Sequence, residues 1–190
     1  TFYQMLSQSK ALPTTSQPTP DDFLPYFERA RDQGDHLICA LLSSQLSGTV
    51  QSAQIAREMC GYEHIYIIDS TLAIVALQAM LDLGEQLRSQ GMSAPDIAAQ
   101  IEAAKSRMRV FGIVDTLEYL HKGGRMSTSV AVVGSLLRVK PIITLKDGIT
   151  AASNATVQDI DSYNVDVTIR EMEAAQLTLS LQDVALAVIN

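Results

Sequence analysis

The sequence lacks the motifs that mark the common nucleotide-binding and hydrolytic enzymes. It has neither a GxGxxG loop nor a GxxxxGK loop followed by Ser or Thr, and no GxSxG element that would present a nucleophilic serine. Its two cysteines and three histidines are too few and too scattered for a zinc site. The residues therefore indicate no metal site, no cofactor and no recognisable catalytic machinery.

Long apolar runs and positive charge are also scarce. The run Leu72–Leu81 is far shorter than the roughly 18 residues of a membrane-spanning helix, and the sequence opens without a signal-peptide pattern. With 14 basic and 21 acidic residues the net charge is −7, which disfavours nucleic acid and anionic membranes as partners. Two cysteines, Cys39 and Cys60, suit a reducing compartment. We expect a cytoplasmic protein with no nucleic-acid partner and no stable membrane insertion.

The composition that remains is typical of a folded globular chain. Of the 190 residues, 47% are hydrophobic and 18% are charged, enough for one large domain or two small ones. Charge is uneven along the chain, because Arg170 is the single basic residue after Asp147. We therefore place a boundary near Gly148, between a region 1–148 and an acidic tail 149–190.

Helix and strand patterns alternate through the first of these regions. This alternation predicts an α/β fold with a mainly parallel sheet and helices on both faces. Ser93 precedes one helix as its N-cap. The tail segments 165–169 and 177–181 alternate apolar and polar residues as half-buried strands do, with no predicted placement. We expect helices at 22–33, 47–59, 71–89, 94–107, 115–122 and 127–137, and strands at 35–42, 62–68, 110–114 and 139–145.

A hydroxyl-rich segment, Ser43–Thr49, joins an expected strand to an expected helix. Open backbone N–H groups and the positive end of a helix make such a junction suited to an anion. Gly48 would let a ligand approach the backbone closely. The alternative for this segment alone is that Ser47 serves as the helix N-cap.

Two further segments carry polar groups at the ends of elements. In Pro13–Pro18 two prolines stiffen an extended stretch of hydroxyl side chains, and the alternative is a structural turn. In His121–Arg125 a helix ending in two glycines presents an arginine, and the alternative is a plain surface charge.

Together these segments resemble the DegV family of bacterial fatty-acid-binding proteins. The similarity covers roughly residues 1–148, and each motif is weak alone although all stand in the family's order. The matching segments are Phe2-Tyr3 with Leu12–Pro18, Leu46–Thr49 with Gln51-Ser52-Ala53, Ile68-Asp69-Ser70, Val114–Leu120, Gly123-Gly124-Arg125 and Lys140-Pro141-Ile142.

The resemblance implies two connected α/β domains with a long-chain fatty acid buried between them. It also implies a carrier rather than an enzyme, the acyl-carrying subunit whose bound fatty acid a separate kinase subunit phosphorylates. On that pattern Thr15 and Ser47 would hydrogen-bond the carboxylate, and Arg125 would lie where the kinase docks. The remaining head-group pocket residues would be Thr14, Ser16, Gly48 and Thr49.

The sequence also departs from the family's pattern. The family's opening strand and its Asp-Ser motif have no counterpart, as if the chain began some way into the family's pattern. Ala73–Leu77 is bulkier than the family's Ser/Gly-rich stretch, and residues 151–190 contain no counterpart of its late histidine. Two other interpretations stay open. One is a phosphate-ester hydrolase or transferase acting through Ser47 with Asp69, and the other is a ligand-free interaction domain.

Overall fold

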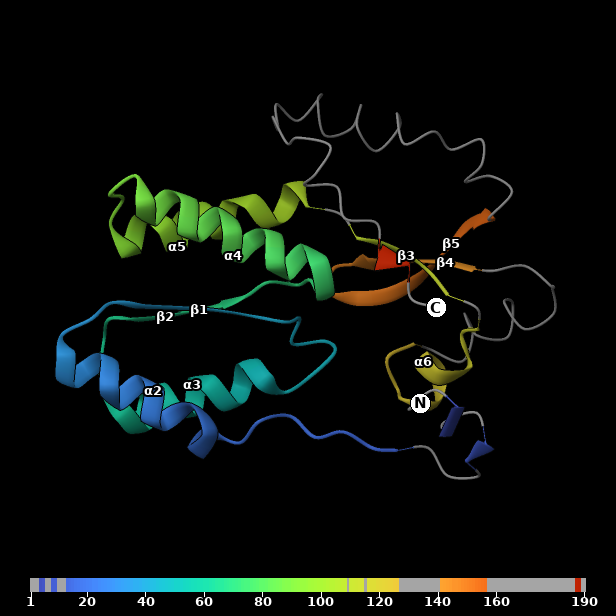
Figure 1. Cartoon of the computed structure of the whole chain (residues 1–190), viewed down its shortest axis with the longest axis horizontal. Helices are drawn as coiled ribbons and strands as arrows, with labels where there is room; N and C mark the ends of the chain where they lie inside the picture. The colour runs from blue at the N-terminus through green and yellow to red at the C-terminus, as the bar shows by residue number, and fades with distance from the viewer. Residues whose placement is uncertain are drawn as a thin grey trace.

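A computed structural model of the chain describes residues 4–5, 8–9, 13–108, 110–114, 116–126, 141–156 and 187–188. Its larger part is a three-layer unit (Figure 1). Two parallel strands, β1 (Leu37–Leu41) and β2 (Ile65–Asp69), pair with Leu37 opposite Ile65. One face is covered by α2 (Pro20–Gln33) and α3 (Thr49–Cys60), and the other by α4 (Ile74–Ser89) and α5 (Ala94–Ala104).

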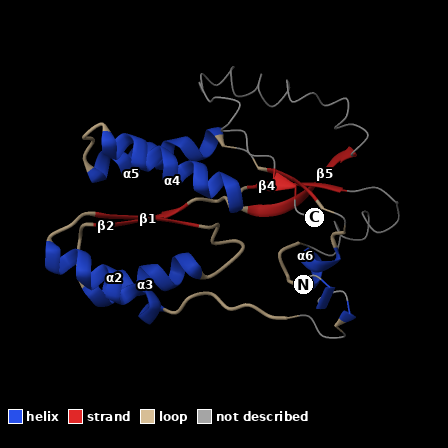
Figure 2. Ribbon diagram, viewed as in Figure 1, coloured by secondary structure: helices blue, strands red, loops and turns tan. Residues whose placement is uncertain are grey.

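A second sheet lies beyond the carboxyl ends of β1 and β2 (Figure 2). Its strand order is β5-β4-β3-β6, with β3 antiparallel to β4, β4 antiparallel to β5, and β3 parallel to β6. The short 3-10 turn η1 (Lys105–Arg107) follows α5, and α6 (Glu118–Lys122) follows β3. The strands are β3 (Phe111–Ile113), β4 (Pro141–Lys146), β5 (Ile149–Thr156) and β6 (Ala187–Val188).

The α/β class is confirmed, and the parallel arrangement holds for β1 and β2. The parallel prediction is wrong for β4, which pairs antiparallel with both β3 and β5, whereas β3 also pairs in parallel with β6. Strand β5 was not among the expected strands. The two-residue turn Asp147-Gly148 joins β4 directly to β5, and so short a connection allows antiparallel pairing alone. The predicted boundary near Gly148 lies within this turn.

Local signals explain where the helices begin and end. Before α2 the N–H and hydroxyl of Thr19 donate to the Asp22 carboxylate at 2.7 and 2.8 Å, so α2 begins at Pro20 rather than at the expected Asp22. Gly34 ends it with φ 72°. Ser93 caps α5 as predicted, since its side chain accepts the Asp96 N–H.

Two helices begin later than expected, each after a turn. Helix α3 starts at Thr49 with Gly48 as its N-cap, two residues past the expected Ser47. Helix α4 starts at Ile74 rather than at Thr71, because its N-cap Ala73 is in an extended conformation, with φ −152° and ψ 172°.

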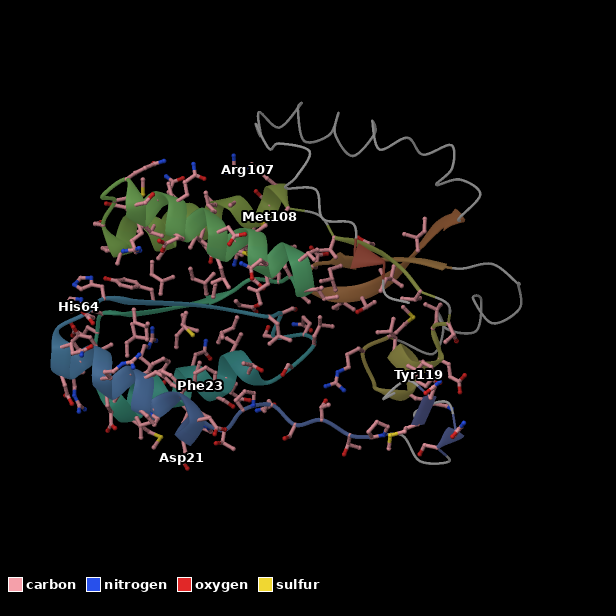
Figure 3. All side chains as sticks on the ribbon, in the orientation of Figure 1. Asp21, Phe23, His64, Arg107, Met108 and Tyr119 are labelled. Atoms are coloured by element: carbon pink, nitrogen blue, oxygen red, sulfur yellow. The ribbon has the colours of Figure 1, made fainter. Side chains whose placement is uncertain are left out.

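Each face of the first sheet has its own hydrophobic core. On the α2/α3 face, Phe27 and Ile65 are fully buried, and Phe23 packs against them from α2 (Figure 3). On the α4/α5 face, Met80 and Ile101 are fully buried against the sheet. His64 marks the amino end of β2, away from the second sheet, so the carboxyl ends of both strands face the second sheet (Figure 3).

Several expectations lie outside the described residues. These are the helix at 127–137 and the tail strands at 165–169 and 177–181. Within the part of the chain that the structure describes, no helix is long and apolar enough to cross a membrane.

Candidate functional site

A pocket of about 330 Å³ opens where β1 and β2 end and α3 begins. The crevice beyond the carboxyl ends of parallel strands is where α/β proteins commonly bind ligands. The pocket contains two of the predicted site residues, Ser47 and Gly48, and is otherwise lined mainly by polar side chains. Its lining residues are Ser44, Ser47, Gly48, Val50, Gln51, Gln54 and Asp69.

Ser47 stands free of the capping role that its position suggested. Gly48 occupies the N-cap of α3 and makes no side-chain cap, so the alternative in which Ser47 caps the helix is wrong. The Ser47 hydroxyl instead lies 2.8 Å from the hydroxyl of Thr49, which is buried at the first helical position. Ser47 lines the pocket, and either hydroxyl can be the donor of this bond. When Thr49 donates to Ser47, the O–H of Ser47 is left to donate to an acceptor in the pocket.

In the loop before α3, the backbone N–H groups already have hydrogen-bond acceptors within the protein. The prediction of open N–H groups is therefore wrong for residues 44–47. Their partners are the Asp69 carboxylate for Ser44 at 3.2 Å, the Ser43 hydroxyl for Gln45 at 3.2 Å, and the Ser43 carbonyl for Leu46 and Ser47 at 3.0 and 3.2 Å.

The open donors belong to the helix rather than to the loop. The Ser52 N–H donates to the Gly48 carbonyl at 3.0 Å as the first helical bond of α3. The N–H groups of the first turn before Ser52 have no acceptor four residues back, and the helix dipole adds partial positive charge there. Val50 and Gln51 of this turn line the pocket. The pocket is thus suited to an anionic group.

Asp69 joins the two loops that form this end of the sheet. Its Oδ1 accepts the N–H of Ser44 from the loop after β1 at 3.2 Å and the N–H of Thr71 from the loop after β2 at 3.0 Å. The ammonium of Lys105 donates to the Asp69 carbonyl at 2.9 Å. Asp69 therefore holds the pocket's two loops together.

The other hydroxyl-rich segment, Pro13–Thr19, is extended and exposed. Thr14, Thr15 and Ser16 are exposed and are absent from the pocket lining. The segment reaches α3 through Gln17, whose amide donates to the buried Ser52 hydroxyl at 3.2 Å.

Gln17 also lies against the backbone of Gly48. A Cβ at Gly48 would lie 2.0 Å from Gln17 Oε1, so the glycine allows this close approach. Sequence reasoning missed Gln17, because a glutamine between threonines and prolines carries no local signal for a contact 35 residues away.

Arg125 contacts the same loop from the second part of the molecule. After α6, its Nε donates to the Leu46 carbonyl at 3.2 Å and its Nη1 to the Gly123 carbonyl at 2.5 Å. The side chain is exposed. Arg125 thus lies beside the loop that carries Ser47, with its charge open to solvent.

Three polar pocket residues were not predicted, although one pattern could have found two of them. Gln51 and Gln54 are three residues apart and so share one face of α3. Ser44, which lies three residues before Ser47, was not singled out.

Burial raises the pKa of the Cys39 thiol to about 11, which keeps it protonated at neutral pH. Within the described ranges no group of three His, Cys, Asp or Glu side chains could hold a metal ion.

Two protein-family models match the sequence. The model described as uncharacterised protein, DegV family, matches residues 1–157. A second, described as NlpA lipoprotein, matches residues 128–190 and so overlaps the end of the first.

Curated relatives agree with the first model. A DegV domain-containing protein of Caldanaerobacter subterraneus is 35% identical over 147 residues, covering 77% of this chain and 52% of the relative. Protein DegV of Bacillus subtilis is 36% identical over 143 residues, covering 75% of this chain and 51% of the relative. The chain thus spans about half the length of these relatives.

Solved structures of the same kind share the fold. A fatty-acid-binding DegV family protein from Thermus thermophilus superposes with a TM-score of 0.79 at 31% identity, covering 90% of this chain and 61% of that one. DegV of Bacillus subtilis, a fatty acid binding protein, gives 0.74 at 30% identity, covering 91% and 62%. With most of its length matched by the family model and by these relatives, the chain belongs to the DegV family.

Proposed function

We propose that this chain binds a long-chain fatty acid and places its carboxylate in the pocket at the start of α3. The observation that carries the proposal is that Ser47 and Gly48 line a pocket formed by the first turn of that helix. Helix N–H groups and the Ser47 hydroxyl, which can accept from Thr49 and donate into the pocket, supply donors that a carboxylate accepts. The related proteins of Thermus thermophilus and Bacillus subtilis, which bind fatty acids, support the same ligand class.

Affinity and orientation would come from different parts of the ligand. Burying an acyl chain contributes roughly 0.8 kcal/mol per methylene before the costs of ordering it. A hydrogen bond to a carboxylate contributes roughly 1.5–3 kcal/mol. A tail of a dozen or more carbons would therefore dominate the free energy of binding, and the hydroxyls would chiefly orient the head group.

Thr15 is proposed as the second carboxylate ligand. It lies two residues before Gln17, whose side-chain amide donates a hydrogen bond to the Ser52 hydroxyl and so holds the Pro13–Thr19 segment against the start of α3. Thr14 and Ser16 flank it and would complete the head-group pocket with Gly48 and Thr49. Gln17 would thus determine how close Thr15 stands to the ligand.

A phosphate-ester hydrolase or transferase site is the alternative that one observation favours. Asp69 shares the pocket with Ser47, as a base for that serine would. However, Asp69 Oδ1 already accepts the N–H groups of Ser44 and Thr71. These bonds give Asp69 a structural role between the two loops, and the fatty-acid-binding relatives make the carrier the better-supported function. The cytoplasm stays the predicted location of this carrier.

Arg125 is proposed as part of the docking surface for a fatty acid kinase subunit. Its guanidinium is exposed and adjoins the Ser47 loop through the Leu46 carbonyl. A planar, permanently charged fork is suited to a phosphate or to a partner's carboxylate. We expect Arg125→Ala to keep the fold and the bound lipid and to lower the rate of phosphorylation by the cognate kinase. Phosphorylation at the wild-type rate across kinase concentrations would contradict this role.

Extraction of the purified protein under denaturing conditions, followed by mass spectrometry, tests the ligand class. A stoichiometric long-chain fatty acid is the expected result. A phosphorylated metabolite would favour the enzyme, and an empty protein that also takes up no added fatty acid would favour a ligand-free interaction domain. The same extraction can be made from the variant Ser47→Ala, which changes the proposed head-group serine. Its matched control is Ser89→Ala, a change at an exposed serine in the last turn of α4.

A further inference from the structure

Ser43 is a fully buried serine at the point where β1 meets the loop carrying Ser47, with 0% of its surface exposed. Its hydroxyl donates to the Gly148 carbonyl at 2.7 Å and accepts the Gln45 N–H at 3.2 Å. Its carbonyl accepts the N–H groups of Leu46 and Ser47. One residue therefore organises the loop and also contacts a turn 105 positions away.

The partner of Ser43 is the tight turn between β4 and β5 of the second sheet. Asp147 and Gly148 have φ values of 52° and 80°, both in the left-handed region that a two-residue hairpin turn requires. A Cβ at Gly148 would lie 2.5 Å from the Ser43 hydroxyl oxygen. A glycine is thus needed there both for the backbone and for the close approach of Ser43.

Ser70 provides a comparison within the same molecule. It also has 0% of its surface exposed and follows the neighbouring strand β2. Its hydroxyl bonds are local, one donated to the Leu72 carbonyl at 3.1 Å and one accepted from the Leu72 N–H at 3.0 Å. The two serines are matched in burial and position, but the hydroxyl of Ser43 reaches the second sheet.

We propose that Ser43 is a positioning residue that couples the head-group loop to the β4–β5 turn. Through this coupling the second sheet determines where Ser47 stands and how well the pocket distinguishes a carboxylate from a neutral head group. The ligand-dependent part of this inference rests on the proposed function. The structural part, a loop held in place by the hairpin, does not depend on any ligand.

The ligand-dependent part is tested by a ratio of affinities. Palmitic acid and its methyl ester share the acyl chain and differ in the head group. Ser43→Ala should lower the preference for the acid by about 10-fold, because a misplaced Ser47 loses one carboxylate bond. Ser70→Ala should lower stability while leaving the ratio unchanged. An unchanged ratio in Ser43→Ala would overturn the positioning role.

The structural part is tested by amide hydrogen exchange without ligand. Gly148→Ala should speed exchange at Gln45, Leu46 and Ser47, since its Cβ displaces the Ser43 hydroxyl. Gly91→Ala is the matched control, because Gly91 also has φ 80° but nothing within 4 Å of its Cβ position.

Equal exchange of the loop amides in the two glycine variants would overturn the coupling, even if the wild-type protein binds fatty acid. Faster exchange in Gly148→Ala alone would support the coupling, even if no fatty acid binds. The failure of the coupling and the failure of the proposed function are therefore distinguishable.

Discussion

Two hydroxyl-rich stretches, the Ser43–Thr49 loop and the Pro13–Thr19 segment, are alike in sequence and very different in structure. The loop is hydrogen-bonded to groups distant in the sequence, among them the Asp69 carboxylate, the Leu72 and Gly148 carbonyls and the exposed Arg125 side chain. The segment is exposed along its length and contacts α3 through Gln17. Hydroxyl content therefore does not by itself make a site.

What distinguishes the loop is that other elements hold it in place. The backbone N–H groups of residues 43–47 are hydrogen-bonded within the protein, so the shape of this stretch does not depend on a ligand. The open donors stand in the first turn of α3, which begins at Thr49. In the segment, the Thr19 hydroxyl is bonded to Asp22 at the start of α2, whereas Thr14, Thr15 and Ser16 are exposed to solvent. If both stretches contact the carboxylate, the loop provides a preformed half of the site. The other half is the segment, whose position depends on the contact of Gln17 with α3.

The largest effect is expected where the loop is anchored. Asp69→Ala removes the acceptor of two backbone N–H groups and should lower the free energy of unfolding by about 2–3 kcal/mol. Urea unfolding measures this. Asp82→Ala is the control, because Asp82 is an exposed carboxylate on α4 that accepts from Gln78, and we expect a change within about 0.5 kcal/mol. Equal losses in the two variants would show that Asp69 is not an anchor.

The next effect separates the two stretches by ligand affinity. Ser47→Ala and Thr15→Val should each weaken fatty-acid binding by about 10- to 100-fold, the effect of one lost bond to a carboxylate. Titration with a fluorescent fatty acid measures both dissociation constants. If Ser47→Ala weakens binding and Thr15→Val does not, the segment is not part of the site. If neither does, the carboxylate lies elsewhere.

A smaller effect is expected where the two stretches meet. Gly48→Ala places a Cβ where the Gln17 amide now lies and should release the segment, as Gln17→Ala should. Each variant should cost about 1 kcal/mol, and the double variant no more than either, because one contact is lost in each case. Faster cleavage within Pro13–Thr19 by a broad-specificity protease should accompany the loss. Additive losses would mean that the two residues act separately.

The smallest effect concerns the end of the segment at α2. Hydrogen bonds from the Thr19 backbone and hydroxyl hold the pKa of Asp22 below its ordinary value. A lowered pKa in the folded state stabilises the protein above the unfolded-state pKa, and this contribution is lost as pH falls through the folded-state pKa. Asp22→Asn should therefore lower the urea midpoint slightly at pH 7 and still less at pH 3. A deficit that is the same at both pH values would contradict this origin.

Local sequence signals predicted the helices well and failed at one sheet. The caps at Ser93 and Gly34 act within a few residues, so they can be recognised in the sequence. Pairing of β3 with β4 joins strands separated by a long stretch of chain, and helix–strand alternation gave no sign that it is antiparallel. The Asp147-Gly148 turn did carry a hairpin signal, which the parallel expectation overlooked.

The candidate site was predictable in part for the same reason. Ser47 and Gly48 stand at a strand–helix junction, which local pattern reveals, and both line the pocket. Gln17 and Ser43 act through contacts 35 and 105 residues apart, which a single sequence does not encode visibly. The acceptors of the loop N–H groups could not be recognised in the sequence either. The sequence therefore could not show that the loop donors are occupied and that the open donors are those of the first turn of α3.

The central claim is that a fatty-acid carboxylate lies beside Ser47, and NMR of palmitic acid labelled with carbon-13 at the carboxyl carbon tests it most directly. We predict one bound carboxyl resonance, distinct from free ligand, that shifts in Ser47→Ala and stays in place in the Ser89→Ala control. Two results would contradict the account. One is a protein fully loaded with palmitic acid whose bound resonance is the same in Ser47→Ala as in the wild type, and the other is a protein that shows no bound resonance at all.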